Sequence, residues 1–185
     1  MDTKQRCSWC LKDTLYMDYH DNIWGIPEYD DRKLFEFLNL EGAQAGLSWY
    51  SILKRFDGYR NAFSDWDAEI IAGFSKKKKE SLMQDPGIIR NRLKIEAVQI
   101  NAKAYLNIME SHSFSDYLWN FLGGQPIINQ WEKLSDIPAS TDLSEKISKD
   151  LKSKGFKFVG PTIVYAFMQA VGMVDDHITS CWKRG

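Results

Sequence analysis

Two pairs of potential metal ligands lie near opposite ends of this 185-residue chain. Cys7 and His20 form the first pair, and the second reads His177-Ile-Thr-Ser-Cys181. A four-residue spacing places both side chains on one face of a helix, a geometry that suits a tetrahedral zinc ion. If all four side chains bind one ion, the two ends of the chain must meet. The pattern therefore predicts a metal clasp that constrains the whole fold.

A fifth candidate ligand, Cys10, keeps two further roles open for these residues. Cys10 forms a CxxC pattern with Cys7, so five side chains compete for four positions. A CxxC pair can carry redox chemistry, but no βαβ pattern surrounds this one, which disfavours that role. His177 and Cys181 could instead cap or pack a terminal helix without metal. Spacing alone does not decide, because neither pair has the compact spacing of a zinc finger.

The length predicts one domain that covers residues 1–185 and buries a substantial core. No apolar run approaches the length of a membrane span, and the charged N-terminus lacks the apolar core of a signal peptide. Three cysteines, an odd number, argue against a disulfide framework. We therefore expect a cytoplasmic protein with no membrane partner.

Charge gives mixed evidence on nucleic-acid binding. The net charge of −1 gives no general support for it. Lysines do crowd one segment, at Lys146, Lys149, Lys152, Lys154 and Lys157. A lysine run is most often a solvated helix face, so it indicates DNA binding only beside a site.

Helical periodicity dominates the chain and predicts an all-α fold. Helices are expected to begin near Asp31 and near Ser48, the first running through position 45. Apolar residues recur at helical spacing further along, at Leu93, Ala97, Ile100 and Ala104.

The C-terminal third predicts two helices joined by a short glycine-bounded loop. Asp142-Leu-Ser-Glu145 resembles a capping box, and Gly155 should end the helix that follows it. Pro161 is favoured in the first turn of the next helix. Backbone N–H groups at that helix start could seat a phosphate. An ordinary helical hairpin with solvated lysines would produce the same pattern.

Glu41 stands out on its predicted helix. Positions 34, 38, 41 and 45 share one face, and the remaining three residues are Leu34, Leu38 and Ala45. A carboxylate on an apolar stripe costs several kcal/mol unless it is paired or hydrogen-bonded. A buried glutamate with satisfied hydrogen bonds would meet this requirement. We favour a carboxylate held in a pocket for charge recognition or acid–base work.

Aromatic residues are concentrated in the first fifty positions, at Trp9, Tyr16, Tyr19, Trp24 and Trp49. Most aromatic side chains belong to a core, and some of these should as well. Tyrosine and tryptophan also offer flat faces for stacking a planar ligand. Electron-rich rings beside a carboxylate would favour a planar cation.

With these residues in place, the chain resembles the DNA-3-methyladenine glycosylase I family of bacterial alkylation repair. The resemblance extends from Cys7 to Cys181. It rests on four stretches in the same order and spacing: Tyr19-His-Asp-Asn-Ile-Trp-Gly25, Leu40-Glu-Gly-Ala-Gln-Ala-Gly-Leu-Ser-Trp49, Gly155-Phe-Lys-Phe-Val-Gly-Pro-Thr162 and Val174-Asp-Asp-His177.

The resemblance implies a helix-hairpin-helix glycosylase fold, with that motif at about residues 142–171. It also implies one structural Zn²⁺ per chain, held by Cys7, His20, His177 and Cys181 and not by Cys10. Four protein ligands leave no open position for an activated water, which is the pattern of a structural site.

The resemblance also assigns site residues. Glu41 matches the pocket glutamate of the family, Tyr19 and Trp49 match residues that contact the base, and Leu47 matches the residue near the gap left by a flipped nucleotide. The remaining implied residues line the aromatic cleft (Tyr16, Trp9 and Trp24) or hold DNA around the hairpin (Gly155, Lys157, Gly160 and Thr162).

The implied activity is hydrolysis of the N-glycosidic bond of 3-methyladenine in double-stranded DNA, by a monomer that flips the damaged base. Related lyases carry a lysine where this chain has Thr162, so strand cleavage is not expected. Asp175 stands where related hairpin glycosylases carry a catalytic aspartate, but we favour a structural place beside His177. A non-catalytic damage-binding module and a glycosylase that also removes 7-methylguanine are the alternatives.

Overall fold

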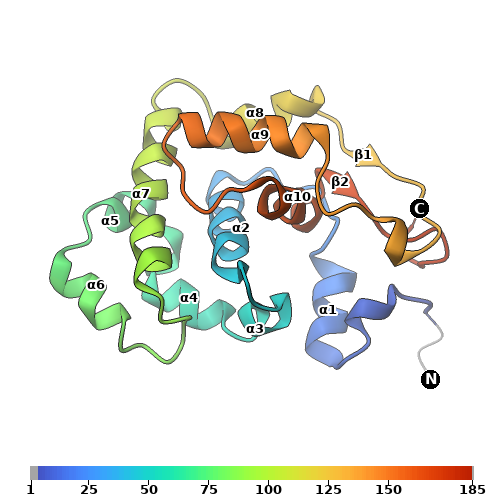
Figure 1. The fold of residues 1–185 in the computed structure, drawn as a ribbon, viewed down its shortest axis with the longest axis horizontal. Helices are drawn as coiled ribbons and strands as arrows, with labels where there is room; N and C mark the ends of the chain where they lie inside the picture. The colour runs from blue at the N-terminus through green and yellow to red at the C-terminus, as the bar shows by residue number, and fades with distance from the viewer. Residues whose placement is uncertain (1–3, 185) are drawn as a thin grey trace.

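Helices form most of the computed structural model, which describes residues 4–184 (Figure 1). In chain order the α-helices of this part of the chain are Thr14–Asn22 (α1), Asp31–Gln44 (α2), Trp49–Leu53 (α3), Phe56–Ala62 (α4), Ala68–Ala72 (α5), Lys76–Leu82 (α6), Arg92–Met109 (α7), Phe114–Trp119 (α8), Asp142–Ser153 (α9) and Pro161–Ala170 (α10). Short 3-10 helices occupy Ser8–Cys10 (η1), Ser64–Trp66 (η2), Asn120–Leu122 (η3) and Leu134–Asp136 (η4). The prediction of a mostly helical fold is confirmed.

Helix α2 lies in the middle of the molecule, with α7, α8 and α10 packed around it (Figure 1). Asp30 caps its first turn, where the carboxylate accepts a hydrogen bond from Lys33 N at 2.9 Å. Leu34, Phe35 and Leu38 on this helix are fully buried. The helix therefore fixes the position of every residue near its C-terminal end, including Glu41.

Helix α7 forms where the apolar spacing indicated, but it buries only part of that apolar set. Ala97 and Ala104 are buried, whereas Leu93 and Ile100 are 66% and 40% exposed. The buried face also includes Ile95, Val98 and Ala102, which recur at helical spacing. Packing of α7 against α5 and α2 selects which face is buried.

Helices α9 and α10 and their connecting loop, residues 154–160, occupy the segment where two helices were predicted (Figure 1). The capping box of α9 begins one residue earlier than expected, since Thr141 pairs with Ser144. Gly155 follows the end of α9 with a φ of +96°, a left-handed conformation that glycine adopts without strain. Pro161 opens α10 as predicted.

The two ends of the chain lie beside each other. Trp182 N donates to Gln5 O at 2.8 Å. Ile127–Ile128 (β1) and Val174–Asp175 (β2) pair as parallel strands. These strands are too short to produce a recognisable alternation of apolar and polar residues in the sequence. Among the described residues, none of the helices combines the length and apolar character needed to cross a membrane.

Candidate functional site

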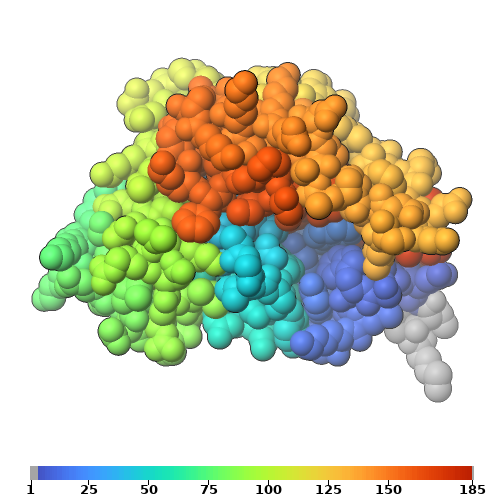
Figure 2. Space-filling model, in the orientation of Figure 1, coloured from blue at the N-terminus to red at the C-terminus, as the bar shows by residue number. Residues whose placement is uncertain are grey.

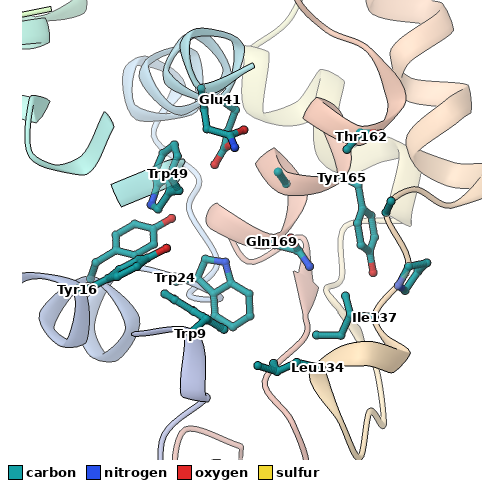
Figure 3. A pocket seen from close by; sticks show the side chains of 15 residues that line it. Trp9, Tyr16, Trp24, Glu41, Trp49, Leu134, Ile137, Thr162, Tyr165 and Gln169 are labelled. Carbon is teal, nitrogen blue, oxygen red and sulfur yellow. The ribbon is translucent and has the colours of Figure 1, made fainter. Parts of the chain in front are cut away.

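A cavity of about 430 Å³ opens where the N-terminal part of the chain, the end of α2, the η4 segment and α10 meet. The space-filling view shows this hollow bordered by blue, cyan and orange parts of the chain (Figure 2). Its walls therefore come from segments far apart in the sequence. A close view shows Glu41 at one side and Trp9 and Trp24 at the opposite side (Figure 3).

Glu41 projects into the cavity although its side chain is almost entirely shielded from solvent, with 4% exposed. Burial raises the pKa of this carboxyl from 4.5 to about 8. The described lining residues include no lysine, arginine or histidine that would stabilise the carboxylate. The cavity thus holds a carboxyl group that a cationic ligand would convert to its charged form.

The aromatic residues predicted at the site all line this cavity. The rings of Tyr19 and Trp49 lie 5.4 Å apart, and those of Trp9 and Trp24 lie 5.1 Å apart. Burial, with the neighbouring Glu41, raises the pKa of Tyr19 well above 10. Its hydroxyl therefore remains a hydrogen-bond donor at neutral pH.

Tyr16 and Trp49 offer further recognition groups. Burial is the main cause that raises the pKa of Tyr16, so this hydroxyl is also uncharged. Trp49 Nε1 is buried and makes no hydrogen bond of good geometry among the described residues, although it lies near enough to the Tyr19 hydroxyl to lower the pKa of that group slightly. The cavity combines flat apolar faces with a few polar atoms, which is typical of a site for a planar ligand.

The opposite wall was not predicted from the sequence. Leu134, Ile137 and Tyr165 line it, together with Gln169 (Figure 3). This wall is held by one carboxylate, since the fully buried Asp176 accepts four hydrogen bonds of 2.7 Å, from Asn129, Trp131, Tyr165 and Gln169. The adjacent acidic residues before His177 were the only sequence signal for it.

The residues that the family resemblance assigned to DNA lie on two exposed segments. Leu47, 40% exposed, sits in the turn of residues 45–48. Gln44 holds this turn, because Leu47 N donates to Gln44 O at 2.7 Å and Gln44 Nε2 donates to Leu47 O at 2.8 Å. Gly46 adopts a φ of +76° there, which explains the glycine.

The second exposed segment is the 154–160 loop and the start of α10. Lys157 is exposed, and no atom lies within 4 Å of where a Cβ would stand at Gly155 or Gly160. The backbone of this loop is therefore accessible to a close approach. Thr162, in the first turn of α10, lines the cavity.

Three of the four predicted metal ligands meet in one buried group. The ligand atoms of Cys7, His20 and Cys181 all lie within 4.8 Å of one another. Cys181 Sγ lies 3.5 Å from His20 Nε2. Two thiols and an imidazole form a donor set that suits zinc. Burial raises the pKa of the Cys7 thiol to about 12, so a cation is needed to hold its thiolate.

His177 lies next to this group but outside the three-residue set. Its ring centre is 4.9 Å from that of His20, and its buried Nε2 has no hydrogen-bond partner among the described residues. Asp21 contacts His20 Nδ1 at 2.8 Å, and Asp175 contacts His177 Nδ1 at 2.7 Å. Carboxylates on Nδ1 leave both Nε2 atoms for a metal, so the residues fit a zinc ion.

The same contacts bear on two residues that the sequence left open. Asp175 Oδ1 accepts hydrogen bonds from both the backbone and the ring of His177, which places it as the partner of that histidine. Cys10 Sγ donates to Cys7 O at 3.1 Å. It lies outside the three-residue group, in agreement with its exclusion from the predicted ligands.

Glu41→Gln is expected to stabilise the folded protein increasingly as pH rises. Because the pKa of Glu41 is about 8 when folded and near 4.5 when unfolded, the wild type loses stability as pH increases between these values. The stability gap should widen by up to about 1.4 kcal/mol per pH unit over that range. Urea unfolding at several pH values measures it.

Glu36→Gln is the matched control for that measurement. Glu36 is also a buried carboxyl on α2, but it lies outside the cavity and pairs with Arg60 at 2.8 Å. Its replacement should destabilise the protein by removing this partner. A pH-independent difference between wild type and Glu41→Gln would refute the assigned environment of Glu41.

Comparison with known proteins agrees with this geometry. The sequence model of the methyladenine glycosylase family matches residues 9–184. DNA-3-methyladenine glycosylase 1 of Escherichia coli K12 is 49% identical, over 96% of this chain and 95% of its own length. A crystal structure of 3-methyladenine DNA glycosylase I superposes with a TM-score of 0.96 at 50% identity, covering 98% of this chain and 100% of that one. A variant of such an enzyme in complex with 3-methyladenine superposes at 0.94 with 40% identity, covering 97% of each chain.

Proposed function

This chain belongs to the methyladenine glycosylase family, and we propose that it releases 3-methyladenine from alkylated double-stranded DNA by hydrolysing the N-glycosidic bond. The observation that carries this proposal is the buried Glu41 in an aromatic cavity without a basic lining residue among those described. Methylation at N3 makes adenine a planar cation, which is the ligand such a cavity favours.

Recognition requires the damaged nucleotide to leave the helix. An enzyme cannot reach the bond inside stacked DNA, and flipping a nucleotide costs roughly a few kcal/mol. In the proposed complex Leu47 occupies the gap, and the backbone around Gly160 with Lys157 holds phosphate. Both segments are exposed on the protein, which supports this arrangement.

Inside the cavity the cationic base would stack on Trp49 and form hydrogen bonds with Glu41 and Tyr19. The rings of Tyr16, Trp9 and Trp24 would shield the base from bulk water. The positive charge weakens the bond to deoxyribose before the protein acts. Water then attacks C1′ and the C1′–N9 bond breaks, so that the base leaves as neutral 3-methyladenine and the proton lost by the attacking water passes to solvent. In this mechanism Glu41 selects the cation and is not required to deprotonate water.

The paired ends of the chain have a structural role in this proposal. Cys7, His20, Cys181 and His177 would hold one zinc ion, which supplies a cross-link between the termini when bound. Four protein ligands complete a tetrahedral shell. No position would remain open for a water, so the reaction takes place in the cavity that holds Glu41 and not at the metal. We propose that the enzyme is monomeric and cytoplasmic.

Chromatography of bases released from methylated DNA tests the proposed function. Release of 3-methyladenine alone is the expected result. Release of 7-methylguanine as well would identify a broader alkylpurine glycosylase. Binding of the damaged DNA without any release would refute the proposal in favour of a damage-binding module.

The reaction is expected to leave the DNA strand intact. A lyase needs an amine that attacks C1′, and Thr162 in the cavity wall cannot supply one. Borohydride should therefore trap no covalent protein–DNA adduct, whereas alkali treatment of the same product should cleave the strand at the abasic site. An adduct retained on denaturing gels would contradict the monofunctional mechanism.

A further inference from the structure

Asn101 on α7 binds the backbone of the 154–160 loop with both groups of its side-chain amide. Its Oδ1 accepts from Lys157 N at 2.7 Å, and its Nδ2 donates to Lys157 O at 3.1 Å. Nδ2 also donates to Oδ1 of Asn39 on α2, at 2.9 Å. Asn101 is 2% exposed, so these bonds are shielded from water. One buried amide thus fixes the loop relative to two helices.

Lys94, two turns earlier on the same helix, binds the end of α2. Its Nζ donates to Ala43 O at 2.8 Å and to Ala45 O at 2.7 Å. The last carbonyl groups of a helix lack partners within it, and a cation is favourable there. These two carbonyls come just before and within the turn that presents Leu47. Lys94 therefore fixes the starting point of that exposed turn.

The loop and α2 also touch directly, at Gly42. A Cβ at this position would lie 3.1 Å from Phe158 Cβ and 3.2 Å from Phe158 O. That distance is too short for an undisturbed contact, so alanine would push the loop away by a few tenths of an ångström. Figure 1 shows the loop descending between α7 and α2, the two helices whose residues make these contacts.

We propose that Lys94 and Asn101 are positioning residues that hold the Leu47 turn and the 154–160 loop at one fixed separation for DNA binding. The inference rests on the proposed function, in which the turn fills the gap left by a flipped nucleotide and the loop holds the neighbouring phosphates. Both segments must then engage one stretch of DNA together. Neither residue lines the base cavity, so their effect on DNA is separable from base recognition.

The test compares Lys94→Met and Asn101→Leu with two exposed α7 controls, Lys103→Met and Asn107→Leu. One assay measures affinity for a duplex with a tetrahydrofuran abasic analogue, and another measures free 3-methyladenine by tryptophan fluorescence. Each of the first two variants should weaken duplex affinity about tenfold or more, since a charge-assisted or buried hydrogen bond is lost. Affinity for the free base should stay unchanged, and the controls should match wild type.

Two further variants separate positioning from fold stability. Gly42→Ala improves helix propensity in α2, so it should fold well and still lose duplex affinity by displacing the loop. The Lys94→Met, Asn101→Leu double variant should lose less duplex affinity than the product of the two single losses. Either change alone already displaces the turn relative to the loop, so the second change adds little.

Unchanged duplex affinity in Gly42→Ala and both single variants would overturn the inference. So would parallel losses of duplex and free-base affinity, which would mean that these residues only stabilise the fold. Failure of the proposed function would look different: wild type itself would release no base and show no preference for the abasic duplex.

Discussion

Cys181→Ser is expected to remove the metal from the purified protein and to lower its stability by about 3 to 5 kcal/mol, or about 10 °C in Tm. Cys181 lies in the group with Cys7 and His20, whose ligand atoms are within 4.8 Å of one another. Serine is a poor zinc ligand, so the ends of the chain would lose their cross-link. Metal analysis and thermal unfolding of the same samples measure both effects.

Cys10→Ser is the matched control, since it makes the same change at another buried cysteine near the group. It should retain about one equivalent of metal. Equal metal content and equal Tm in the two variants would sink the proposed clasp. His177→Ala extends the test to the fourth proposed ligand, whose Nε2 has no hydrogen-bond partner among the described residues.

Glu41→Gln is expected to slow single-turnover excision of 3-methyladenine by about 10- to 100-fold, because a hydrogen bond to a charged group contributes about 1.5 to 3 kcal/mol. The neutral amide keeps the shape of the side chain but cannot become an anion. Binding to undamaged DNA should not change. Timed release of the base under excess enzyme measures the effect.

The pH dependence gives that prediction a second, independent readout. The cationic base favours the carboxylate form of Glu41, whose pKa is about 8 in the folded protein without a ligand. Wild-type excision at subsaturating DNA should therefore increase from pH 6 to pH 8. The increase should be absent in Glu41→Gln and present in Glu36→Gln, which retains the cavity carboxyl. Identical profiles for Glu41→Gln and wild type would exclude a role for its ionisation.

One half of the site could be predicted from the sequence because its residues stand out by local pattern, by residue type or by their place at helix ends. Glu41 interrupts an apolar helix face, and it does line the cavity. The proposed metal ligands are recognisable by residue type, and the ligand atoms of three of them lie within 4.8 Å of one another. Pro161 and Gly155 mark helix ends through backbone geometry alone. Each of these signals is local and chemical.

The second half depends on tertiary packing, which leaves little trace in local pattern. Leu134 and Ile137 look like ordinary loop residues until Asp176 holds their segment against α10. On α7, the exposed Leu93 and Ile100 fit a helical stripe as well as the buried residues do, and only the neighbouring helices select between them. Asn101 carries no sequence signal for its contact with a loop 56 positions away.

The meeting of the chain ends also has a kinetic consequence. His20 and Cys181 touch across 161 positions of sequence, and contacts between such distant positions are slow to form because a long loop must close first. α1, which supplies the tyrosine wall, packs beside this contact, so we expect the central helices to reach native packing before the base cavity exists. In native-state hydrogen exchange, the amides of residues 5–24 should accordingly exchange as one unit, with a lower opening free energy than the amides of α2. Damage recognition would then be the last property that this chain acquires as it folds.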